Sequence, residues 1–180
     1  PFSYRTAHII AMPEAVKVSL CRVDGISRLL LAFAVFLCSI AQVHAAKVDT
    51  LSIQSQAMSK AIKTVVILPQ KYSKGENYPV LYLLHGYSGN YSNWVKNSSV
   101  NALADQYGYM VVCPDGGFGS WYWDIANDKN YQYETFVSKE LIDYIDTHYS
   151  TIKDRKGRAI SGLSMGGHGA LSLAIKHQDV

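Results

Sequence analysis

The most informative stretch of this chain is Arg158-Ala-Ile-Ser-Gly-Leu-Ser-Met-Gly-Gly-His-Gly-Ala170. It contains the pattern G-x-S-x-G at Gly162, Ser164 and Gly166, after a short apolar segment and before small residues that suit a helix. A serine at a tight strand-to-helix turn projects its hydroxyl out of a sheet, and flanking glycines allow backbone approaches that a Cβ would block. The pattern therefore predicts a nucleophilic Ser164 between a strand and a helix that begins near Met165.

Strand-like and helix-like segments alternate along the chain. Apolar runs, or alternating apolar and polar residues, predict strands over residues 51–56, 61–68, 78–84, 109–113 and 158–163. Helices are predicted over residues 100–107 and 133–149, the latter from side chains at Val137, Leu141, Tyr144, Ile145 and His148. The first two strands fit a hairpin or a sheet edge. Because strands and helices then alternate, we expect one α/β sandwich with a mostly parallel sheet.

The pair His85-Gly86 ends a predicted buried strand and should lie close to Ser164, because the carboxyl ends of parallel strands meet at one sheet edge. An oxyanion hole needs two converging donors, and we expect the backbone N–H groups of Tyr87 and Met165 to supply them. His85 could itself be a catalytic base. A histidine at the end of a strand more often shapes this loop, with its imidazole bound to the backbone.

The segment Trp121-Tyr-Trp-Asp124 follows another predicted strand, so it should lie at the rim of the same site. Trp121, Tyr122 and Trp123 could wall a substrate pocket for an acyl group or a sugar, or one or two of them could fill the core. Asp124 precedes the serine, whereas the usual chain order is serine, acid and then histidine. We therefore do not expect Asp124 to be the acid of a triad.

The remaining histidines have simpler interpretations. His168 lies four residues after Ser164 and could pair with it as a base, but on a helix it would lie one turn behind the serine, which favours a packing role. His148 and His177 lie at predicted helix ends, where histidine faces the helix dipole or solvent. The sequence has no phosphate-binding loop, no complete G-x-G-x-x-G and no metal-ligand cluster, so no cofactor or metal is implied.

Composition and charge are those of an ordinary folded domain, with 48% hydrophobic and 17% charged residues. The net charge is +3, from 17 Lys+Arg and 14 Asp+Glu. Four of the basic and two of the acidic residues precede residue 46. Residues 46–180 therefore contain 13 basic and 12 acidic residues. A nearly neutral body argues against a nucleic-acid partner.

Residues 1–45 have the pattern of an export signal. A basic flank precedes the apolar run Leu29–Ile40, which is shorter than the ~20 residues that span a bilayer, and small residues follow it. This order predicts an upstream segment and a signal peptide cleaved after Ala45, hence a secreted or periplasmic protein without a stable membrane span. A buried helix and a lipoprotein anchor on Cys38 are the alternatives. Cys113 is then a lone cysteine, interpreted as a buried strand residue rather than a nucleophile.

Three motifs in this order resemble those of the putative-esterase family of α/β-hydrolases: Leu83–Trp94, Ser120–Asp124 and Ser161–Ala170. That family includes esterase D (S-formylglutathione hydrolase), the feruloyl, acetyl-xylan and tributyrin esterases, and the antigen 85 mycolyltransferases. The resemblance covers about residues 50–180. It implies an α/β-hydrolase sandwich and acyl transfer by a Ser-Asp-His triad, with an acyl-enzyme on Ser164.

In that family the Asp and the His follow the serine later in the chain, whereas this sequence ends at Val180. We therefore interpret residues 46–180 as the N-terminal part of an α/β-hydrolase domain, C-terminally truncated, and expect it to be inactive or weak by itself. The expected function is a serine esterase acting on short acyl or hydroxycinnamoyl esters, free or linked to polysaccharide. The alternatives are an acyltransferase of the same family and a non-catalytic carbohydrate-binding protein on this fold.

Overall fold

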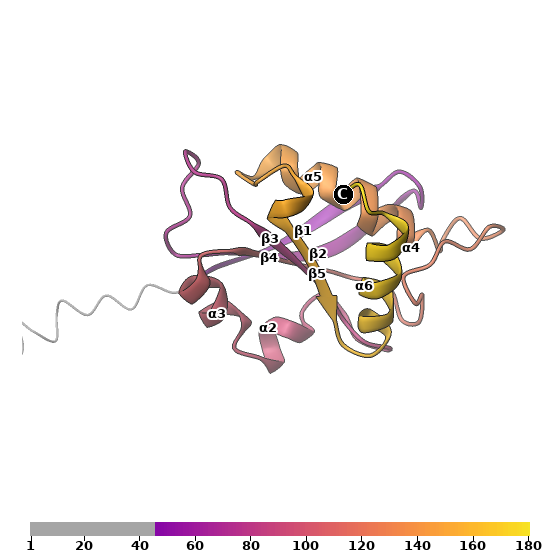
Figure 1. Ribbon diagram of the computed structural model, residues 1–180. Coiled ribbons are helices and arrows are strands. Elements are labelled where there is room, and N and C mark those ends of the chain that lie inside the picture. The colour runs from indigo at the N-terminus through magenta and orange to yellow at the C-terminus, as the bar shows by residue number, and fades with distance from the viewer. Residues whose placement is uncertain (1–45) are drawn as a thin grey trace, which may run out of the picture. The chain divides into compact units, whose positions relative to one another are not determined.

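The computed structural model describes residues 46–180, which form one mixed sheet with helices on both faces (Figure 1). The strands are β1 (Lys47–Ser55), β2 (Lys60–Leu68), β3 (Val80–Leu84), β4 (Met110–Pro114) and β5 (Arg158–Gly162). Their order across the sheet is β1-β2-β4-β3-β5. β1 pairs with β2 and β2 with β4 in antiparallel fashion, whereas β4, β3 and β5 are parallel. The predicted signal peptide lies outside the described residues.

Helical segments cover both faces of this sheet. They are α2 (Asn93–Asn97), α3 (Val100–Tyr107), α4 (Tyr133–Thr135), the π-helical η1 (Phe136–Glu140), α5 (Leu141–His148), the 3₁₀ turn η2 (Arg155–Gly157) and α6 (Met165–Lys176). α2 and α3 lie on one face, and the continuous α4-η1-α5 segment lies with α6 on the other (Figure 1). None of the helices among residues 46–180 has both the length and the apolar character needed to cross a bilayer.

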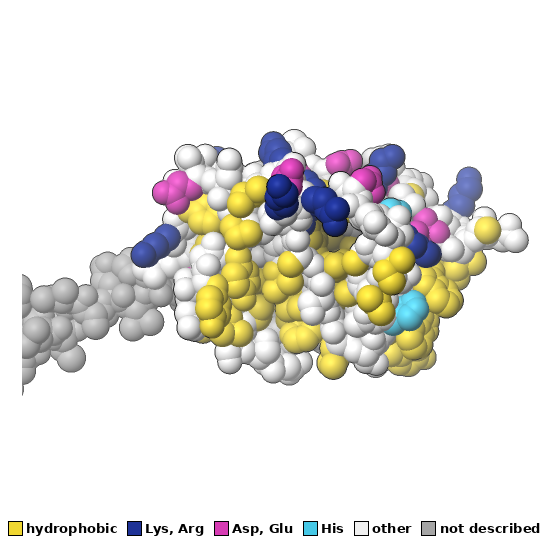
Figure 2. Space-filling model, viewed as in Figure 1, with side chains coloured by type: hydrophobic (Ala, Val, Ile, Leu, Met, Phe, Trp, Pro, Cys, Tyr) yellow, Lys and Arg dark blue, Asp and Glu magenta, His cyan; other side chains and the backbone are white. Residues whose placement is uncertain are grey.

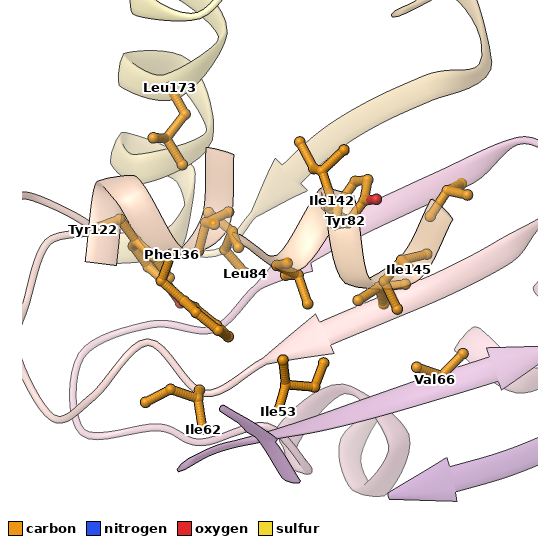
Figure 3. Packing of buried hydrophobic residues seen from close by; sticks show 14 of the residues in the cluster. Ile53, Ile62, Val66, Tyr82, Leu84, Tyr122, Phe136, Ile142, Ile145 and Leu173 are labelled. Atoms are coloured by element: carbon orange, nitrogen blue, oxygen red, sulfur yellow. The ribbon is translucent and has the colours of Figure 1, made fainter. Parts of the chain in front are cut away.

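The core has two layers because side chains alternate along each strand. Val66 and Leu84 from the strands belong to the larger cluster, together with Phe136 and Leu173 from the helices (Figure 3). The neighbouring residues on the strands point into a smaller cluster under α3, which includes Cys113. Burial raises the pKa of the Cys113 thiol to about 12. The interpretation of Cys113 as a buried strand residue is therefore confirmed.

The predicted strands and helices are present with three adjustments. The first strand begins at Lys47, four residues before the predicted start at Leu51. The strand predicted from residue 78 is regular only from Val80, because Pro79 offers no N–H to a ladder, and Tyr78 makes an isolated bridge to Thr151. The helix predicted over residues 133–149 is continuous over residues 133–148, but it contains the π-helical turn η1 at its centre. The short helix α2 was not predicted.

β5 forms one margin of the sheet among the described residues. Beside it lies a groove of about 340 Å³ between α5 and α6, lined by apolar side chains that include Leu173 and Val180 and by polar ones that include Arg158 and His177. Ser164 does not line this groove.

The face turned toward the viewer in Figure 2 carries most of its charged side chains along the upper part and many hydrophobic side chains below them.

Candidate active site

Ser164 occupies the sharp turn between β5 and α6. Its backbone has φ +54° and ψ −114°, a conformation that a residue with a Cβ adopts only at a cost of about 1–3 kcal/mol. Its side chain is exposed to solvent. A strained, accessible serine at the N-terminus of a helix is the arrangement expected of a nucleophile.

The two flanking glycines allow three backbone segments to converge at this turn. A Cβ on Gly162 would lie 2.5 Å from the carbonyl oxygen of Gly166 and 2.8 Å from that of Leu84. A Cβ on Gly166 would lie 2.6 Å from the carbonyl oxygen of His85. No real Cβ tolerates such distances to backbone atoms. The start of α6 therefore approaches the end of β3 this closely only because both positions are glycine.

The His85-Gly86 loop lies directly beside the serine. A Cβ on Gly86 would be 3.6 Å from the Cβ of Ser164 and 3.2 Å from the carbonyl oxygen of Leu163. This contact brings together two motifs that are far apart in the sequence. It also places the following peptide, which carries the Tyr87 N–H, next to the candidate nucleophile.

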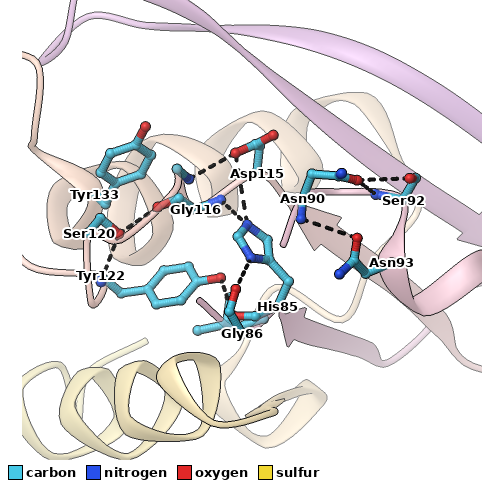
Figure 4. A network of polar contacts seen from close by, with 12 residues as sticks. His85, Gly86, Asn90, Ser92, Asn93, Asp115, Gly116, Ser120, Tyr122 and Tyr133 are labelled. Carbon is cyan, nitrogen blue, oxygen red and sulfur yellow. Dashed lines mark hydrogen bonds and ion pairs between the residues drawn. The ribbon is translucent and has the colours of Figure 1, made fainter. Parts of the chain in front are cut away.

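His85 is 2% exposed, and both of its ring nitrogens are occupied (Figure 4). The Gly116 N–H donates to Nε2 over 2.7 Å, so Nε2 is an acceptor and the ring proton lies on Nδ1. Nδ1 is 2.7 Å from the Gly86 carbonyl oxygen, which accepts that proton. His85 is thus bound to backbone groups in this structure, and its ring is not available as a base for Ser164.

Two backbone N–H groups near the serine turn belong to Tyr87, which follows Gly86, and to Met165, which follows Ser164. Among residues 46–180, neither the Tyr87 N–H nor the Met165 N–H donates to a protein acceptor. Met165 is the first residue of α6, where the helix dipole favours negative charge.

The three aromatic residues Trp121, Tyr122 and Trp123 lie partly at the surface and partly in the core. Trp121 and Trp123 are 43% and 47% exposed, and both rings lie edge to face against His168, with centroid distances of 5.4 and 5.3 Å. Tyr122 between them is fully buried. Its assignment to the pocket wall is corrected, because φ values near +55° at Trp121 and Tyr122 turn the tyrosine inward and the tryptophans outward.

Tyr122 connects α6 to the His85 loop. Its hydroxyl donates to the His85 carbonyl oxygen over 3.1 Å, and its ring packs so closely on α6 that a Cβ on Gly169 would lie 2.5 Å from Cδ2. Burial raises the pKa of Tyr122 above its ordinary value, so the hydroxyl stays protonated and remains a donor. This role of Tyr122 was not predicted from the sequence, although Gly169 in the Gly167-His-Gly169 segment is a signal of close packing.

The other polar residues of interest have structural partners. Asp124 accepts hydrogen bonds from the backbone N–H and the hydroxyl of Thr135, the last residue of α4. His148 binds the Tyr144 carbonyl oxygen and stacks on that ring at the end of α5. His177, after α6, binds Glu134. Within residues 46–180, none of the histidines is bonded to the Ser164 hydroxyl, and no three metal-binding side chains gather.

Residues 55–180 match the family model Esterase, whose description is "Putative esterase". The chain belongs to this esterase family. A relative in the family, "Acetyl esterase" of Caldicellulosiruptor saccharolyticus, is 34% identical over 131 residues, which are 68% of this chain and 48% of the relative. "Diacylglycerol acyltransferase/mycolyltransferase Ag85A" of Mycobacterium leprae is 37% identical over 141 residues, covering 73% of this chain and 41% of the relative.

A solved "ferulic acid esterase" has the same fold as this esterase-family chain, with a TM-score of 0.67 and 34% identity. The match covers 74% of this chain and 55% of that structure. The fold is therefore of the α/β-hydrolase type, as predicted. The chain spans about half the length of the relatives that it matches.

Proposed function

We propose that the whole protein is a serine carboxylic-ester hydrolase in which Ser164 forms the acyl-enzyme. The observation that carries this proposal is the strained, exposed Ser164 at the sharp turn between β5 and α6, with the His85-Gly86 loop beside it. The family relationship supports ester chemistry in general, because relatives carry the names acetyl esterase and ferulic acid esterase.

The proposed reaction has two steps. The Ser164 Oγ attacks the ester carbonyl carbon while a base takes its proton, and the oxyanion of the tetrahedral intermediate accepts hydrogen bonds from the N–H groups of Tyr87 and Met165. The intermediate expels the alcohol, which takes up that proton. Water then attacks the acyl-enzyme and releases the acid and the free serine. We propose that the triad Asp and His are supplied by residues that follow Val180 in the full-length protein.

We propose esters of short acyl or hydroxycinnamoyl groups as substrates. Exposed Trp121 and Trp123 lie against His168, on the first turn of the helix that Ser164 begins, where a flat ring could stack on them. The predicted export signal favours substrates outside the cytoplasm, including esters on polysaccharide. We propose secretion or a periplasmic location on the same ground.

An acyltransferase is the second candidate, because a relative with 37% identity carries that name. The two reactions share the acyl-enzyme and differ only in whether water or another alcohol attacks it. Adding glycerol or a sugar to the assay and analysing the products separates them. A dominant acylated alcohol would favour the transferase.

The test of the nucleophile is covalent labelling of the full-length protein with a fluorophosphonate probe. We expect labelling at Ser164, its loss in Ser164→Ala, and its retention in Ser161→Ala, a matched control because Ser161 is an exposed serine on β5. Hydrolysis of p-nitrophenyl acetate and of a ferulate ester should likewise be lost in Ser164→Ala and retained in Ser161→Ala. Labelling and hydrolysis that persist in Ser164→Ala would overturn the proposal.

A further inference from the structure

His168 lies on the first turn of α6, on the same side of the helix as the candidate nucleophile. The His168 N–H donates to the Ser164 carbonyl oxygen over 3.0 Å, so the two residues are one helical turn apart. Their separation along the helix axis is about 6 Å. The Cα–Cβ bond of a helical residue tilts toward the N-terminus of its helix, which for His168 is the serine turn.

The exposed His168 ring contacts both of the exposed tryptophans. Its centroid lies 5.4 Å from that of Trp121 and 5.3 Å from that of Trp123, with interplanar angles of 85° and 70°. Edge-to-face pairs of this kind are favourable beyond the area that they bury. Within residues 46–180 the imidazole makes no hydrogen bond or ion pair, so it meets the two indoles as a flat ring.

The loop that carries the tryptophans crosses α6 at His168 and at the next residue. Tyr122, between the tryptophans, packs on Gly169, where a Cβ would lie 2.5 Å from Cδ2 of the tyrosine. The buried ring fixes the loop, whereas Trp121 and Trp123 remain nearly half exposed on either side of it in the sequence. Their contacts with His168 therefore support two side chains that are still open to a ligand.

We propose that His168 is a positioning residue that holds Trp121 and Trp123 in place for the aromatic ring of a hydroxycinnamoyl group, and so sets the preference for that acyl group. The inference rests on the proposed function and deepens it. Side chains that are ordered before binding spare the ligand the entropy cost of ordering them. An acetyl group has no ring to stack and gains nothing from the ordered indoles. His168 takes no part in the chemical step.

Two substitutions in the full-length protein test this role with methyl ferulate and methyl acetate, which differ only in the acyl group. In His168→Ala both indoles lose their support, so we expect KM for methyl ferulate to rise about tenfold. KM for methyl acetate and kcat for both esters should change by less than about twofold, because the lost interaction is equal in the ground and transition states. In His168→Phe a flat ring remains, and KM for methyl ferulate should return to within about threefold of the unchanged protein.

The positioning role makes exclusive demands on these kinetics. Alanine has the highest helix propensity, so His168→Ala should leave α6 intact. A fall of kcat for both esters would overturn the role, because it would place His168 in the chemical step. An unchanged KM for methyl ferulate, an equal rise for both esters, or no recovery in His168→Phe would overturn it as well. Failure of the proposed function is recognised separately, by hydrolysis that persists in Ser164→Ala.

Binding of free ferulate, followed by NMR, tests the same role without hydrolysis. The indole N–H signals of Trp121 and Trp123 should shift on titration with ferulate. The signal of Trp94, whose indole N–H donates to the Leu84 carbonyl oxygen, should not shift and serves as the internal control. In His168→Ala the dissociation constant should rise about tenfold, and the two indoles should become more mobile by heteronuclear NOE. Indole signals that ignore ferulate, or that are equally rigid in both proteins, would overturn the proposal.

Discussion

Trp121 and Tyr122 are two consecutive bulky residues with left-handed backbone conformations. Each such residue costs about 1–3 kcal/mol and persists only where its surroundings compensate. The compensation is the complete burial of the Tyr122 ring and the hydrogen bond that its hydroxyl makes to His85. Strain at these two residues therefore presents Trp121 and Trp123 at the rim while the Tyr122 hydroxyl secures the His85 loop.

The Tyr122 hydroxyl should contribute measurably to stability. In Tyr122→Phe the buried His85 carbonyl loses a donor, so we expect the free energy of unfolding in urea to fall by about 1–2 kcal/mol. Tyr107→Phe is the control, because Tyr107 is exposed and should change stability by less than about 0.5 kcal/mol. Equal effects of the two substitutions would contradict the buried hydrogen bond.

Gly166 should not tolerate even a methyl group. In an ordinary helix, replacing glycine with alanine stabilises by about 1 kcal/mol. Here the new Cβ would meet backbone oxygens, so we expect Gly166→Ala to lower the free energy of unfolding by about 3 kcal/mol. In Gly75→Ala the nearest atom is the Ser73 Oγ at 3.7 Å, and urea denaturation should show almost no change. A stabilised Gly166→Ala would show that α6 and β3 are further apart.

At the scale of elements, an ion pair joins α6 to α4. Glu134 accepts from Lys176 Nζ over 2.7 Å and lies 3.0 Å from Nε2 of His177. Burial alone would raise the pKa of Glu134, but these partners outweigh burial and lower it below its ordinary value. The ionised form is therefore favoured by folding. Its contribution to stability is present above the pKa of the unfolded chain and is lost as the pH falls through the lowered, folded value.

Glu134→Gln should reveal this dependence. Because Lys176 is half exposed, we expect a loss of only about 0.5–1 kcal/mol at pH 7. The difference from the unchanged protein should shrink as the pH falls below 4.5, the ordinary value for glutamate. Denaturation curves at several pH values give the measurement, with Asp179→Asn, an exposed site, as the control. A difference that grows in acid would contradict the ion pair.

The elements themselves were largely predictable from the sequence. The apolar runs that became β3 and β4 are unbroken because both faces of these strands are buried, and the amphipathic pattern over residues 133–149 marked a helix. The π-helical turn at Phe136–Glu140 left no signal, since adding one residue to a turn leaves local composition unchanged.

The candidate site was predictable in outline because its motifs follow parallel strands. His85-Gly86 and the serine turn meet as the topology requires. The inward position of Tyr122 was not predictable, because three neighbouring aromatic residues have similar hydrophobicity and only the backbone angles decide which one is buried. The hydrogen bond from Gly116 to His85 joins two loops, and no periodicity reports such a contact.

For the whole molecule, the near balance of charge over residues 46–180 predicts weak attraction to polyanions. Thirteen basic and twelve acidic residues leave a surplus of only one positive charge to neutralise phosphates. We expect a protein that begins at residue 46 to show no binding to labelled duplex DNA by fluorescence anisotropy at about 0.15 M salt, near physiological ionic strength. Sub-micromolar binding with a steep salt dependence would contradict this expectation.

The pairing of β3 with β5 has a kinetic consequence. Val80 pairs with Arg158 and Leu84 with Gly162, so the ladder under the serine closes a long loop that contains β4 and most of the helices. Closing such a loop costs entropy before its contacts repay it, so the ladder should form late in folding. Pulse-labelled hydrogen exchange should show amide protection in the β1–β2 hairpin before β5, and the reverse order would contradict this. A chain halted partway through folding then carries only an ordinary, unreactive serine.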